Sequence, residues 1–480
     1  MKRLKFRLTR GVVLASAALT LSLGVRAQAQ TFSYFANFNA RAAGATLMQA
    51  TDGNFYMGGF PGAYGQGAIY RVTPSAEFEV LYSFCAQRGC PDGKAPLTPI
   101  LGSDGNFYGV TEGGGNRVGG GTVYKLTLGG ELTTLYTFCI TVDCPDGAQP
   151  IGVIQASDGN LYGVTFGAGL QNAGTLFRVN PTTAEFKVLH YFCSTPTCAD
   201  GYNQFFGPIQ GSDGNLYGTT YGGGANGGGV LYQITTAGEY QVLYNFCSLS
   251  NCLDGGGPSP LVQDAKGNFF GAASGGGSKG YGTVFEFTLT HQYIVLDNFD
   301  FVRGTPLVSL AGVTLANDGN LYGITEGGLN AATVYKTTPT GEITFLNTFG
   351  TCAEDSGWYL NSSMFQATNG TLYGTTAFGN SDGDCNPYGS GYGTIYSLTG
   401  LNPLVETVPV QGSVGKSVII LGNGLTGSTS VTFNGVAAEF TVESDSYIKA
   451  TVPAGATTGT VSVVTPSGTL NSNPQFVVTK

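Results

Sequence analysis

The chain has 480 residues and a formal net charge of −9; only 11% of the residues are charged, and 77 are glycine. The surplus of acidic residues, 30 against 21 basic ones, argues against a nucleic-acid partner, which would require clustered lysine and arginine. So much glycine and so little charge are unusual for a globular enzyme, but they fit an array of tight turns. The aromatic residues, 12% of the chain, would fill the spaces between its layers.

Residues 1–29 have the composition of a secretory signal peptide. Five basic residues among the first ten precede an apolar stretch from Val12 to Leu23, and Ala27-Gln28-Ala29 is a typical cleavage pattern. The stretch is too short to cross a bilayer comfortably. We therefore expect export without a transmembrane anchor after cleavage. Since the segment holds six basic and no acidic residues, the mature chain would keep 15 basic and 30 acidic groups, a charge of −15.

A turn motif then recurs seven times, and its glycines lie 52, 54, 55, 53, 52 and 51 residues apart. A period of this size is typical of a tandem array of four-stranded units. The copies are Asp52-Gly53-Asn54, Asp104-Gly105-Asn106, Asp158-Gly159-Asn160, Asp213-Gly214-Asn215, Lys266-Gly267-Asn268, Asp318-Gly319-Asn320 and Asn369-Gly370-Thr371.

Each repeat predicts four short β-strands. The turn joins two β-prone segments, because Asp-Gly supplies the positive φ that a tight hairpin needs. Side chains alternate in size after a Gly-rich gap, as in residues 121–127, which predicts a third strand, and residues 132–138 illustrate the fourth. Four such strands make one blade of a β-propeller.

The seventh repeat lacks a fourth strand, and the mature N-terminus offers one. Phe35-Ala36-Asn37-Phe38 reads like the fourth-strand segment Leu243-Tyr244-Asn245-Phe246. Pairing the two chain ends would leave no open sheet edge between the first and last blades. The sequence thus predicts an all-β protein with a seven-bladed β-propeller over residues 31–400, closed by its N-terminal strand, and a small immunoglobulin-like β-sandwich over residues 401–480.

Eight of the ten cysteines form four pairs of identical spacing, each just after a predicted fourth strand. In an exported protein these pairs predict local disulfides, Cys85–Cys90, Cys139–Cys144, Cys193–Cys198 and Cys247–Cys252. Neither of the two histidines lies at ligand spacing to a pair, which disfavours a metal site. Cys352 and Cys385 are left to pair with each other. Asp-Gly follows each of the four pairs, and it is more typical of a turn than of a cation site.

The up-and-down order of strands places the Gly-rich loops and the Cys loops on one face of the ring, and the Asp-Gly-Asn hairpins on the other. Function usually lies on long, variable loops held by a rigid scaffold. Aromatic and acidic residues on the first face could stack on sugars and hydrogen-bond to them, although the aromatic ones could equally pack the loops together. The candidates are Glu112, Phe166, Tyr221, Tyr281, Glu326, Tyr388 and Tyr392.

No arrangement of catalytic residues is evident. Glu112 and Glu326 occupy equivalent positions but lie in the second and sixth repeats, nearly across the ring, whereas a glycosidase needs two carboxylates about 5 to 9.5 Å apart. The chain has no nucleophile elbow. The alternation of Asn380, Asp382, Asp384 and Asn386 resembles a calcium loop, but Cys385 stands where glycine should turn the chain and no bidentate Glu follows. We therefore expect no enzyme and no cofactor, with calcium as the one alternative.

Residues 402–480 lose the cysteines and the turn motif, and several short strands predict a sandwich. This part closely resembles the IPT/TIG family of immunoglobulin-like domains, in residues 414–425, in Val431-Thr432-Phe433-Asn434-Gly435-Val436 and in Ala450-Thr451-Val452-Pro453-Ala454-Gly455. Leu425 stands where the family usually has Phe. The resemblance implies an interaction or spacer module without catalytic residues.

The repeats resemble the GloVer tandem-repeat proteins, an exported bacterial family, over residues 45–398. Asp213 to Thr220 and Gly282 to Phe285 carry the family pattern, whereas the first repeat departs from it at Met57. The family has no established activity to carry over. The prediction is an exported binding or adhesion protein, periplasmic, on the cell surface or extracellular, whose partner is a glycan or a protein. An enzyme acting on extracellular polysaccharide and a structural surface component are the alternatives.

Overall fold

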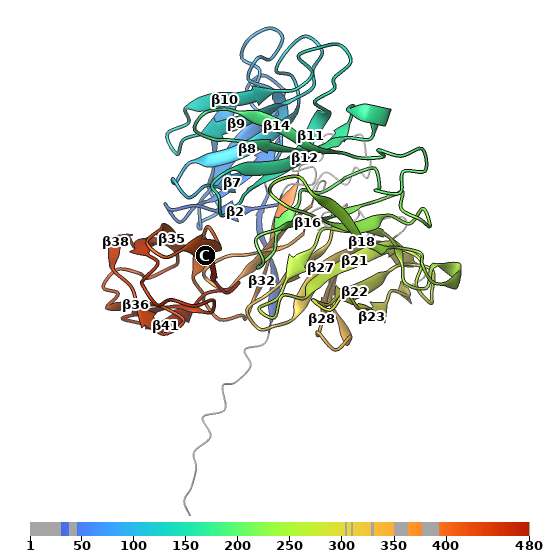
Figure 1. Ribbon diagram of the computed structural model, residues 1–480. Coiled ribbons are helices and arrows are strands. Elements are labelled where there is room, and N and C mark those ends of the chain that lie inside the picture. Colours follow the sequence, from blue (N-terminus) through green and yellow to red (C-terminus); the bar gives the residue numbers. More distant parts are fainter. Residues whose placement is uncertain are drawn as a thin grey trace, which may run out of the picture.

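The computed structural model describes residues 30–37, 46–302, 305–308, 311–327, 331–349, 363–376 and 393–479. The predicted signal peptide, residues 1–29, lies outside them. In the described part, each turn motif belongs to one antiparallel sheet, which gives seven successive sheets in the repeated region. These sheets are the propeller blades of the all-β fold, and we number them by turn motif (Figure 1). The total number of blades stays a prediction.

The first four sheets hold β2 (Met48–Gln49), β3 (Phe55–Gly59), β4 (Ala68–Val72) and β5 (Phe78–Ser83); β6 (Lys94–Pro96), β7 (Ile100–Leu101), β8 (Phe107–Gly113), β9 (Thr122–Leu126) and β10 (Leu132–Thr137); β11 (Ala148–Gln155), β12 (Leu161–Gly167), β13 (Thr175–Val179) and β14 (Phe186–Tyr191); and β15 (Ile209–Gln210), β16 (Leu216–Thr220), β17 (Val230–Ile234) and β18 (Tyr240–Asn245). Two short 3₁₀ turns, η1 (Leu170–Asn172) and η2 (Ser250–Cys252), lie in loops.

The remaining three sheets hold β19 (Gly256–Pro258), β20 (Val262–Gln263), β21 (Phe269–Gly275), β22 (Thr283–Phe287) and β23 (Tyr293–Asn298); β24 (Phe301–Val302), β25 (Thr305–Val308), β26 (Val313–Leu315), β27 (Leu321–Gly327), β28 (Ala331–Thr337) and β29 (Ile343–Thr348); and β30 (Phe365–Gln366), β31 (Leu372–Thr376), β32 (Thr394–Thr399) and β1 (Thr31–Asn37).

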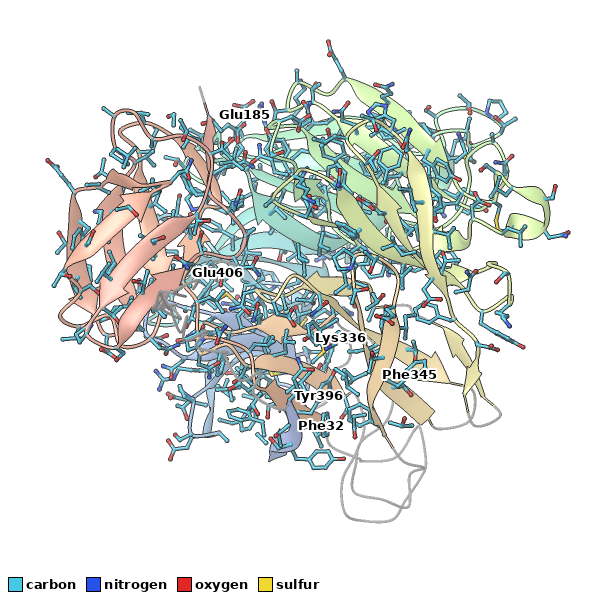
Figure 2. All side chains as sticks on the ribbon, turned by 90° about the horizontal axis from the view of Figure 1, so that it is seen from below. Phe32, Glu185, Lys336, Phe345, Tyr396 and Glu406 are labelled. Carbon is cyan, nitrogen blue, oxygen red and sulfur yellow. A yellow bond between two sulfur atoms is a disulfide. The ribbon has the colours of Figure 1, made fainter. Side chains whose placement is uncertain are left out.

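The two ends of the repeated region meet in the seventh sheet. β1 runs antiparallel to β32, with Thr31 opposite Thr399 and Asn37 opposite Thr394. Phe32 stacks on Tyr396 with ring centroids 5.5 Å apart, as Figure 2 shows. The sequence placed this strand at residues 35–38, whereas it begins at Thr31, and the partly buried Phe32 packs against a core cluster. The pairing covers the edge of β32 that would otherwise be open to other chains.

Packing explains why a glycine follows the tyrosine in most repeats. Gly218 of β16 lies opposite Tyr232 of β17, and a Cβ atom on Gly218 would stand 2.3 Å from the tyrosine hydroxyl. The ring therefore lies flat over the glycine. The same pairing recurs at Gly109 and Tyr124, Gly163 and Phe177, Gly271 and Phe285, Gly323 and Tyr335, and Gly374 and Tyr396.

Each Asp-Gly-Asn turn is fixed by its own side chains. In the fourth sheet, the Asp213 carboxylate accepts hydrogen bonds from the Asn215 backbone N–H at 3.1 Å, the Asn215 amide at 2.7 Å and the Tyr217 hydroxyl at 2.8 Å. Such a turn mimics a backbone turn and tolerates the left-handed glycine between the two side chains. The same bonds occur at Asp52, Asp104, Asp158 and Asp318.

Glutamines at the ends of first strands join neighbouring blades. Gln263 Oε1 accepts a hydrogen bond from the Ser212 N–H of the preceding blade at 2.9 Å, and its Nε2 donates to the Gly267 carbonyl at 2.9 Å. At the closure of the ring, Gln49 Oε1 accepts from the Thr368 N–H at 3.0 Å. In the second and sixth sheets a leucine, Leu101 or Leu315, takes the glutamine's place.

The C-terminal domain is a β-sandwich of two four-stranded sheets and one parallel strand pair. One sheet holds β33 (Glu406–Val408), β35 (Ser417–Leu421), β39 (Tyr447–Thr451) and β38 (Phe440–Ser444); the other holds β37 (Val436–Ala437), β36 (Ser430–Phe433), β40 (Val461–Thr465) and β41 (Gly468–Asn471); β34 (Gln411–Ser413) pairs with β42 (Val477–Thr479). Buried aliphatic residues between the sheets form its core.

The sandwich packs onto the hairpin face of the propeller, next to the first and last sheets (Figure 1). Ile419 and Leu421 join Leu101 in one apolar cluster. Ser446 Oγ donates a hydrogen bond to the Thr51 carbonyl at 2.7 Å, and Asn473 Nδ2 donates to the Leu315 carbonyl at 3.1 Å. Asn423 Nδ2 also donates to Thr368 Oγ1 of the seventh sheet at 2.5 Å. The contacts of the C-terminal domain therefore reach the first, second, sixth and seventh sheets.

Candidate binding site at the mouth of the central cavity

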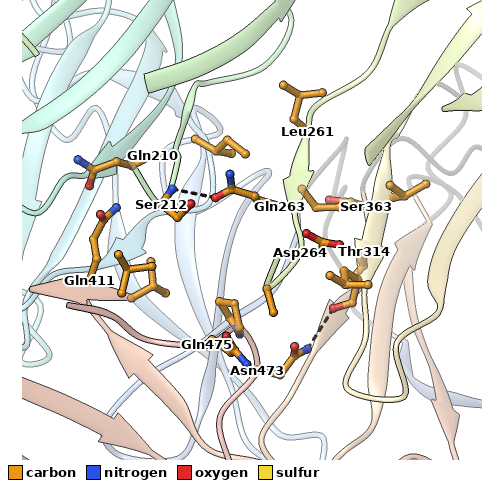
Figure 3. Close-up of a pocket in the computed structure, with 18 of the residues that line it drawn as sticks. Gln210, Ser212, Leu261, Gln263, Asp264, Thr314, Ser363, Gln411, Asn473 and Gln475 are labelled. Carbon is orange, nitrogen blue, oxygen red and sulfur yellow. Dashed lines mark hydrogen bonds between the residues drawn. The ribbon is translucent and has the colours of Figure 1, made fainter. Parts of the chain in front are cut away.

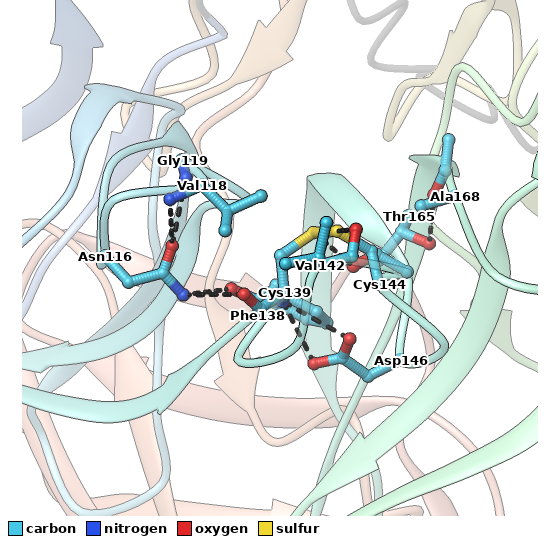
Figure 4. The surroundings of a disulfide bond; sticks show 12 residues. Asn116, Val118, Gly119, Phe138, Cys139, Val142, Cys144, Asp146, Thr165 and Ala168 are labelled. Carbon is cyan, nitrogen blue, oxygen red and sulfur yellow. Dashed lines mark hydrogen bonds between the residues drawn. A yellow bond between two sulfur atoms is a disulfide. The ribbon is translucent and has the colours of Figure 1, made fainter.

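The four predicted disulfides are confirmed as Cys85–Cys90, Cys139–Cys144, Cys193–Cys198 and Cys247–Cys252. The acid of the following Asp-Gly holds each loop closed. The Asp146 carboxylate accepts hydrogen bonds from the Cys139 N–H at 3.1 Å and the Tyr136 hydroxyl at 2.8 Å (Figure 4). Asn116 ties the neighbouring Gly-rich loop to the same loop, since its Nδ2 donates to the Cys139 carbonyl at 2.9 Å.

The repeated Asp-Gly acids therefore stabilise loops. In the fourth copy, Asp254 accepts from the Ser248 N–H at 2.8 Å, the Leu249 N–H at 3.0 Å and the Tyr244 hydroxyl at 2.7 Å. Burial raises the pKa of Asp254, but these hydrogen bonds to the charged form outweigh it and hold the pKa below its ordinary value.

Before the third Cys loop, His190 stands at the position that a tyrosine occupies before the other three loops. Its Nε2 lies 3.0 Å from Asp200 Oδ2, and its ring stacks on Tyr240 with centroids 3.9 Å apart. Burial lowers the pKa of His190, and the nearby Asp200 carboxylate only partly offsets this effect. The histidine thus belongs to the packing between blades and closes the loop as tyrosine does elsewhere.

A cavity of about 640 Å³ opens at the centre of the ring on the Cys-loop side. Its walls come from the first strands of several blades and from the ends of second strands. Pro96 and Phe205, which follow Cys loops, line it together with Phe60 and Glu112. Rigid strands thus surround a concave space, which is the usual setting of a ligand site.

A group of aromatic side chains gathers around Phe205, which lines this cavity. Phe205 is 42% exposed and Tyr221 is 41% exposed. The Phe205 ring lies 5.3 Å from the ring of Phe166 and 5.3 Å from that of Tyr221, edge to face with the latter. Phe206 follows at 6.5 Å and lines the cavity. We call these four residues the aromatic shelf.

The shelf arises where the fourth repeat departs from the others. Six residues span Pro96–Leu101, Pro150–Gln155 and Pro258–Gln263, whereas the matching segment Gln204–Gln210 has seven. The extra residue falls in the Phe205-Phe206 pair. Gln204 replaces the proline, and its side chain is fully buried with no hydrogen-bond partner for either amide atom. Sequence reasoning found Phe166 and Tyr221 but missed both phenylalanines, although the one-residue insertion could have shown them.

The other predicted site residues have different surroundings. Glu112 lines the cavity with an exposed side chain, and desolvation by the surrounding wall raises the pKa of its carboxyl group. Tyr281 packs against a buried cluster that holds Val284 of its own blade and Val313 and Tyr335 of the next blade. Glu326 lies in β27, but its side chain is outside the described residues. Tyr388, Tyr392, the calcium candidates Asn380, Asp382, Asp384 and Asn386, and the remaining cysteines Cys352 and Cys385 also lie outside them.

Within the described part of the chain, no group of three or more His, Cys, Asp or Glu side chains could hold a metal ion. No helix there is long and apolar enough to cross a lipid bilayer.

Comparison with models of protein families shows to which family the repeated region belongs. Residues 18–207 and 196–396 match the model of the Gloeobacter/Verrucomicrobia repeat. The chain belongs to this family. Residues 404–478 of this Gloeobacter/Verrucomicrobia repeat protein match the IPT/TIG domain. Both resemblances drawn from the sequence are thus confirmed.

Solved structures with a similar fold include a fungal alcohol oxidase in complex with copper, at 15% identity and a TM-score of 0.52, covering 95% of this chain and 100% of that one. A periplasmic gluconolactonase from Pseudomonas aeruginosa, at 14% identity and a TM-score of 0.43, covers 73% of this chain and 96% of its own. At these identities the likeness to the oxidase extends to the fold alone. No curated protein matches the chain.

Proposed function

We propose that this repeat protein is an exported binding protein that holds a glycan chain on the aromatic shelf. The observation that carries the proposal is the exposure of Phe205, which lines the 640 Å³ cavity, and of Tyr221, whose ring lies 5.3 Å from that of Phe205. Large aromatic side chains gain free energy when they are covered, and contiguous exposed patches of them mark interaction sites. A pyranose ring offers a flat C–H face that suits such a surface.

The geometry of the shelf favours a ligand of extended shape. The Phe166 ring packs against Phe205 at an interplanar angle of 33°, and Tyr221 stands at 84° to Phe205, so the two exposed rings form a corner. Preorganised rings lose little conformational entropy when a ligand binds. Glu112, in the wall of the same cavity, can accept a hydrogen bond from a sugar hydroxyl.

Charge and disulfides support the class of ligand and the compartment. A mature chain with 30 acidic and 15 basic groups repels polyanions, so a neutral glycan is favoured over an acidic one. Four disulfides in one chain suit an oxidising compartment outside the cytoplasm.

The test is retention of the mature chain in affinity electrophoresis on neutral polysaccharides, such as cellulose derivatives, xylan, mannan and β-glucan. We expect retardation by at least one of them. Phe205→Ala and Tyr221→Ala should each weaken retention about tenfold, since a stacked ring contributes on the order of 1–2 kcal/mol. Phe345→Ala, at an aromatic residue that is equally exposed on the outer strand β29, is the matched control. Equal loss in all three variants, or no retardation at all, would refute the proposal.

An enzyme acting on polysaccharide is the second candidate, and one observation favours it. The raised pKa of the Glu112 carboxyl group is the property of a general acid. Release of reducing ends by the wild-type chain, abolished in Glu112→Gln, would establish it. A structural role through the hairpin face has less support, because apolar residues there lie under the C-terminal domain.

A further inference from the structure

One position of the repeat places a residue at the Cys-loop end of each second strand. It stands seven residues after the glycine of the turn motif. The strand registers agree, because the residue before it pairs with the start of the third strand, as Gly59 does with Ala68 in the first blade and its counterparts do in the second and fourth. In the first six repeats the position is occupied by Phe60, Glu112, Phe166, Tyr221, Ser274 and Glu326.

The residue of the first repeat, Phe60, lines the central cavity together with Glu112 of the neighbouring blade. It comes just after Met57, where the first repeat departs from the family pattern. A Cβ atom at Gly58 would stand 2.5 Å from the Pro96 carbonyl oxygen, so glycine there lets the first strand of the second blade come close. Phe60, Pro96 and Glu112 therefore belong to one wall of the cavity, built by the first two blades.

The aromatic shelf belongs to a different wall of the same cavity. Phe205 and Phe206 line it from the fourth blade, three blades further round the ring than Phe60. Residues 151–154, an apolar part of the first strand of the third blade, line the space between the two walls. A short ligand that lies on the shelf would therefore leave the wall of Phe60 free, and only a longer chain would reach both.

The wall of the first two blades offers the two kinds of contact that a sugar ring can use. Phe60 is partly exposed and presents an apolar ring to the cavity. The Glu112 side chain is exposed, and within the described part of the chain no residue hydrogen-bonds to its carboxylate. A pyranose can stack its C–H face on the aromatic ring while one of its hydroxyl groups donates to the carboxylate.

This wall is reached from the Cys-loop side, where the cavity opens. At the other end of the first strands the C-terminal domain lies against the propeller, and Gln263 and Thr314 of the fifth and sixth blades face Asn473 there (Figure 3). A glycan therefore approaches Phe60 across the same mouth by which it approaches the shelf.

We infer that Phe60 and Glu112 form a second sugar subsite, so that the protein binds an oligosaccharide segment long enough to span the cavity mouth from the shelf to this wall. The inference rests on the proposed function, because it adds a subsite to the same glycan site. Two weak contacts made by one ligand strengthen each other, since the second forms within the complex. Affinity should therefore rise steeply with the length of the oligosaccharide.

Isothermal titration calorimetry on the full mature chain tests this inference, with cellotetraose, xylotetraose, mannotetraose and laminaritetraose as probes, each beside its disaccharide. We expect at least one tetrasaccharide to bind about tenfold more tightly than its disaccharide. Phe60→Ala should lower the affinity for that tetrasaccharide about tenfold and leave the affinity for the disaccharide, which fits on the shelf alone, nearly unchanged. Phe345→Ala, at the exposed aromatic residue of β29, is the control and should bind as wild type does.

The outcomes separate this inference from the proposed function. A tetrasaccharide that binds to Phe60→Ala as tightly as to wild type, or no more tightly than its disaccharide, would overturn the second subsite and leave the shelf intact. Binding of none of the probes would overturn the proposed function and the second subsite with it. Should Phe60→Ala fail to fold, Phe60→Leu keeps apolar volume in the wall but removes the flat ring, and the same loss is expected.

Discussion

At the scale of single residues, a few residue types recur at the same position in most repeats, because each one meets a specific geometric requirement. The second-strand glycine that lies opposite the third-strand aromatic makes room for its ring, and the aspartate of most turns and of each Cys loop collects donors that would otherwise be unpaired. These tasks are local, so they can be tested one position at a time.

Gly218→Ala should destabilise the fold by about 1–3 kcal/mol, because the added methyl group would overlap the Tyr232 ring. Urea unfolding monitored by circular dichroism measures this change. Gly152→Ala is the control, since a Cβ at that strand glycine meets nothing within 4 Å and its φ is not in the left-handed region. Similar midpoints for the two variants would contradict the packing argument.

Asp254→Ala should cost about 1–3 kcal/mol at pH 7, because the backbone N–H groups of Ser248 and Leu249 and the Tyr244 hydroxyl lose their acceptor. The pKa of Asp254 is lowered in the folded state, so its contribution is present above the ordinary aspartate pKa and is lost as the pH falls through the lowered value. The difference in melting temperature from wild type should therefore shrink in acid. Asp143→Ala, at an exposed acid in the Cys139–Cys144 loop, should show neither effect.

At the scale of elements, the sequence predicted what local rules determine. The turns, the alternation of strands and the cysteine pairs follow from φ preferences, side-chain period and loop length, and the structure has them where the motifs stand. The shelf could be predicted only in part. The segment that carries Phe205 is one residue longer than its counterparts, and the packing of this segment decides where the Phe205 ring lies. The docking of Ile419 and Leu421 on the first and second blades has no local signature at all.

The glutamine links suggest a test of ring closure. Gln49→Leu should fit sterically, because leucine stands at this position in two other blades, but it leaves the buried Thr368 N–H without its acceptor. We expect a loss of about 1–3 kcal/mol in the free energy of unfolding. Gln87→Leu, in an exposed loop, should change it by no more than about 0.5 kcal/mol. If both variants unfold at the wild-type urea concentration, the link contributes nothing to closure.

At the scale of the whole molecule, two domains share one interface, and a carboxyl group lies in it. Glu406 of β33 is on the face of its sheet that also carries Val408, which packs toward the propeller; Figure 2 shows it between the two domains. Desolvation raises the pKa of Glu406 to about 7. The protein therefore holds this group neutral more readily than the unfolded chain does.

This raised pKa gives the docked structure a pH dependence of defined sign. The contribution of Glu406 is fully present below the ordinary glutamate pKa and is lost as the pH rises through about 7. Glu406→Gln should therefore melt at a higher temperature than wild type at pH 7.5, with the difference vanishing near pH 4.5. Glu439→Gln, at an exposed glutamate of the same domain, controls for the lost charge. A constant difference across this range would contradict the placement of Glu406.

The central claim is that ligands bind where the fourth repeat breaks the pattern of the others. Hydrogen–deuterium exchange of the mature chain, with and without the polysaccharide that retards it most, tests this claim directly. The account predicts slower exchange in residues 202–208 and 220–224, which carry Phe205 and Tyr221, and little change in the outer strands. Protection confined to other segments while the glycan is bound would contradict it.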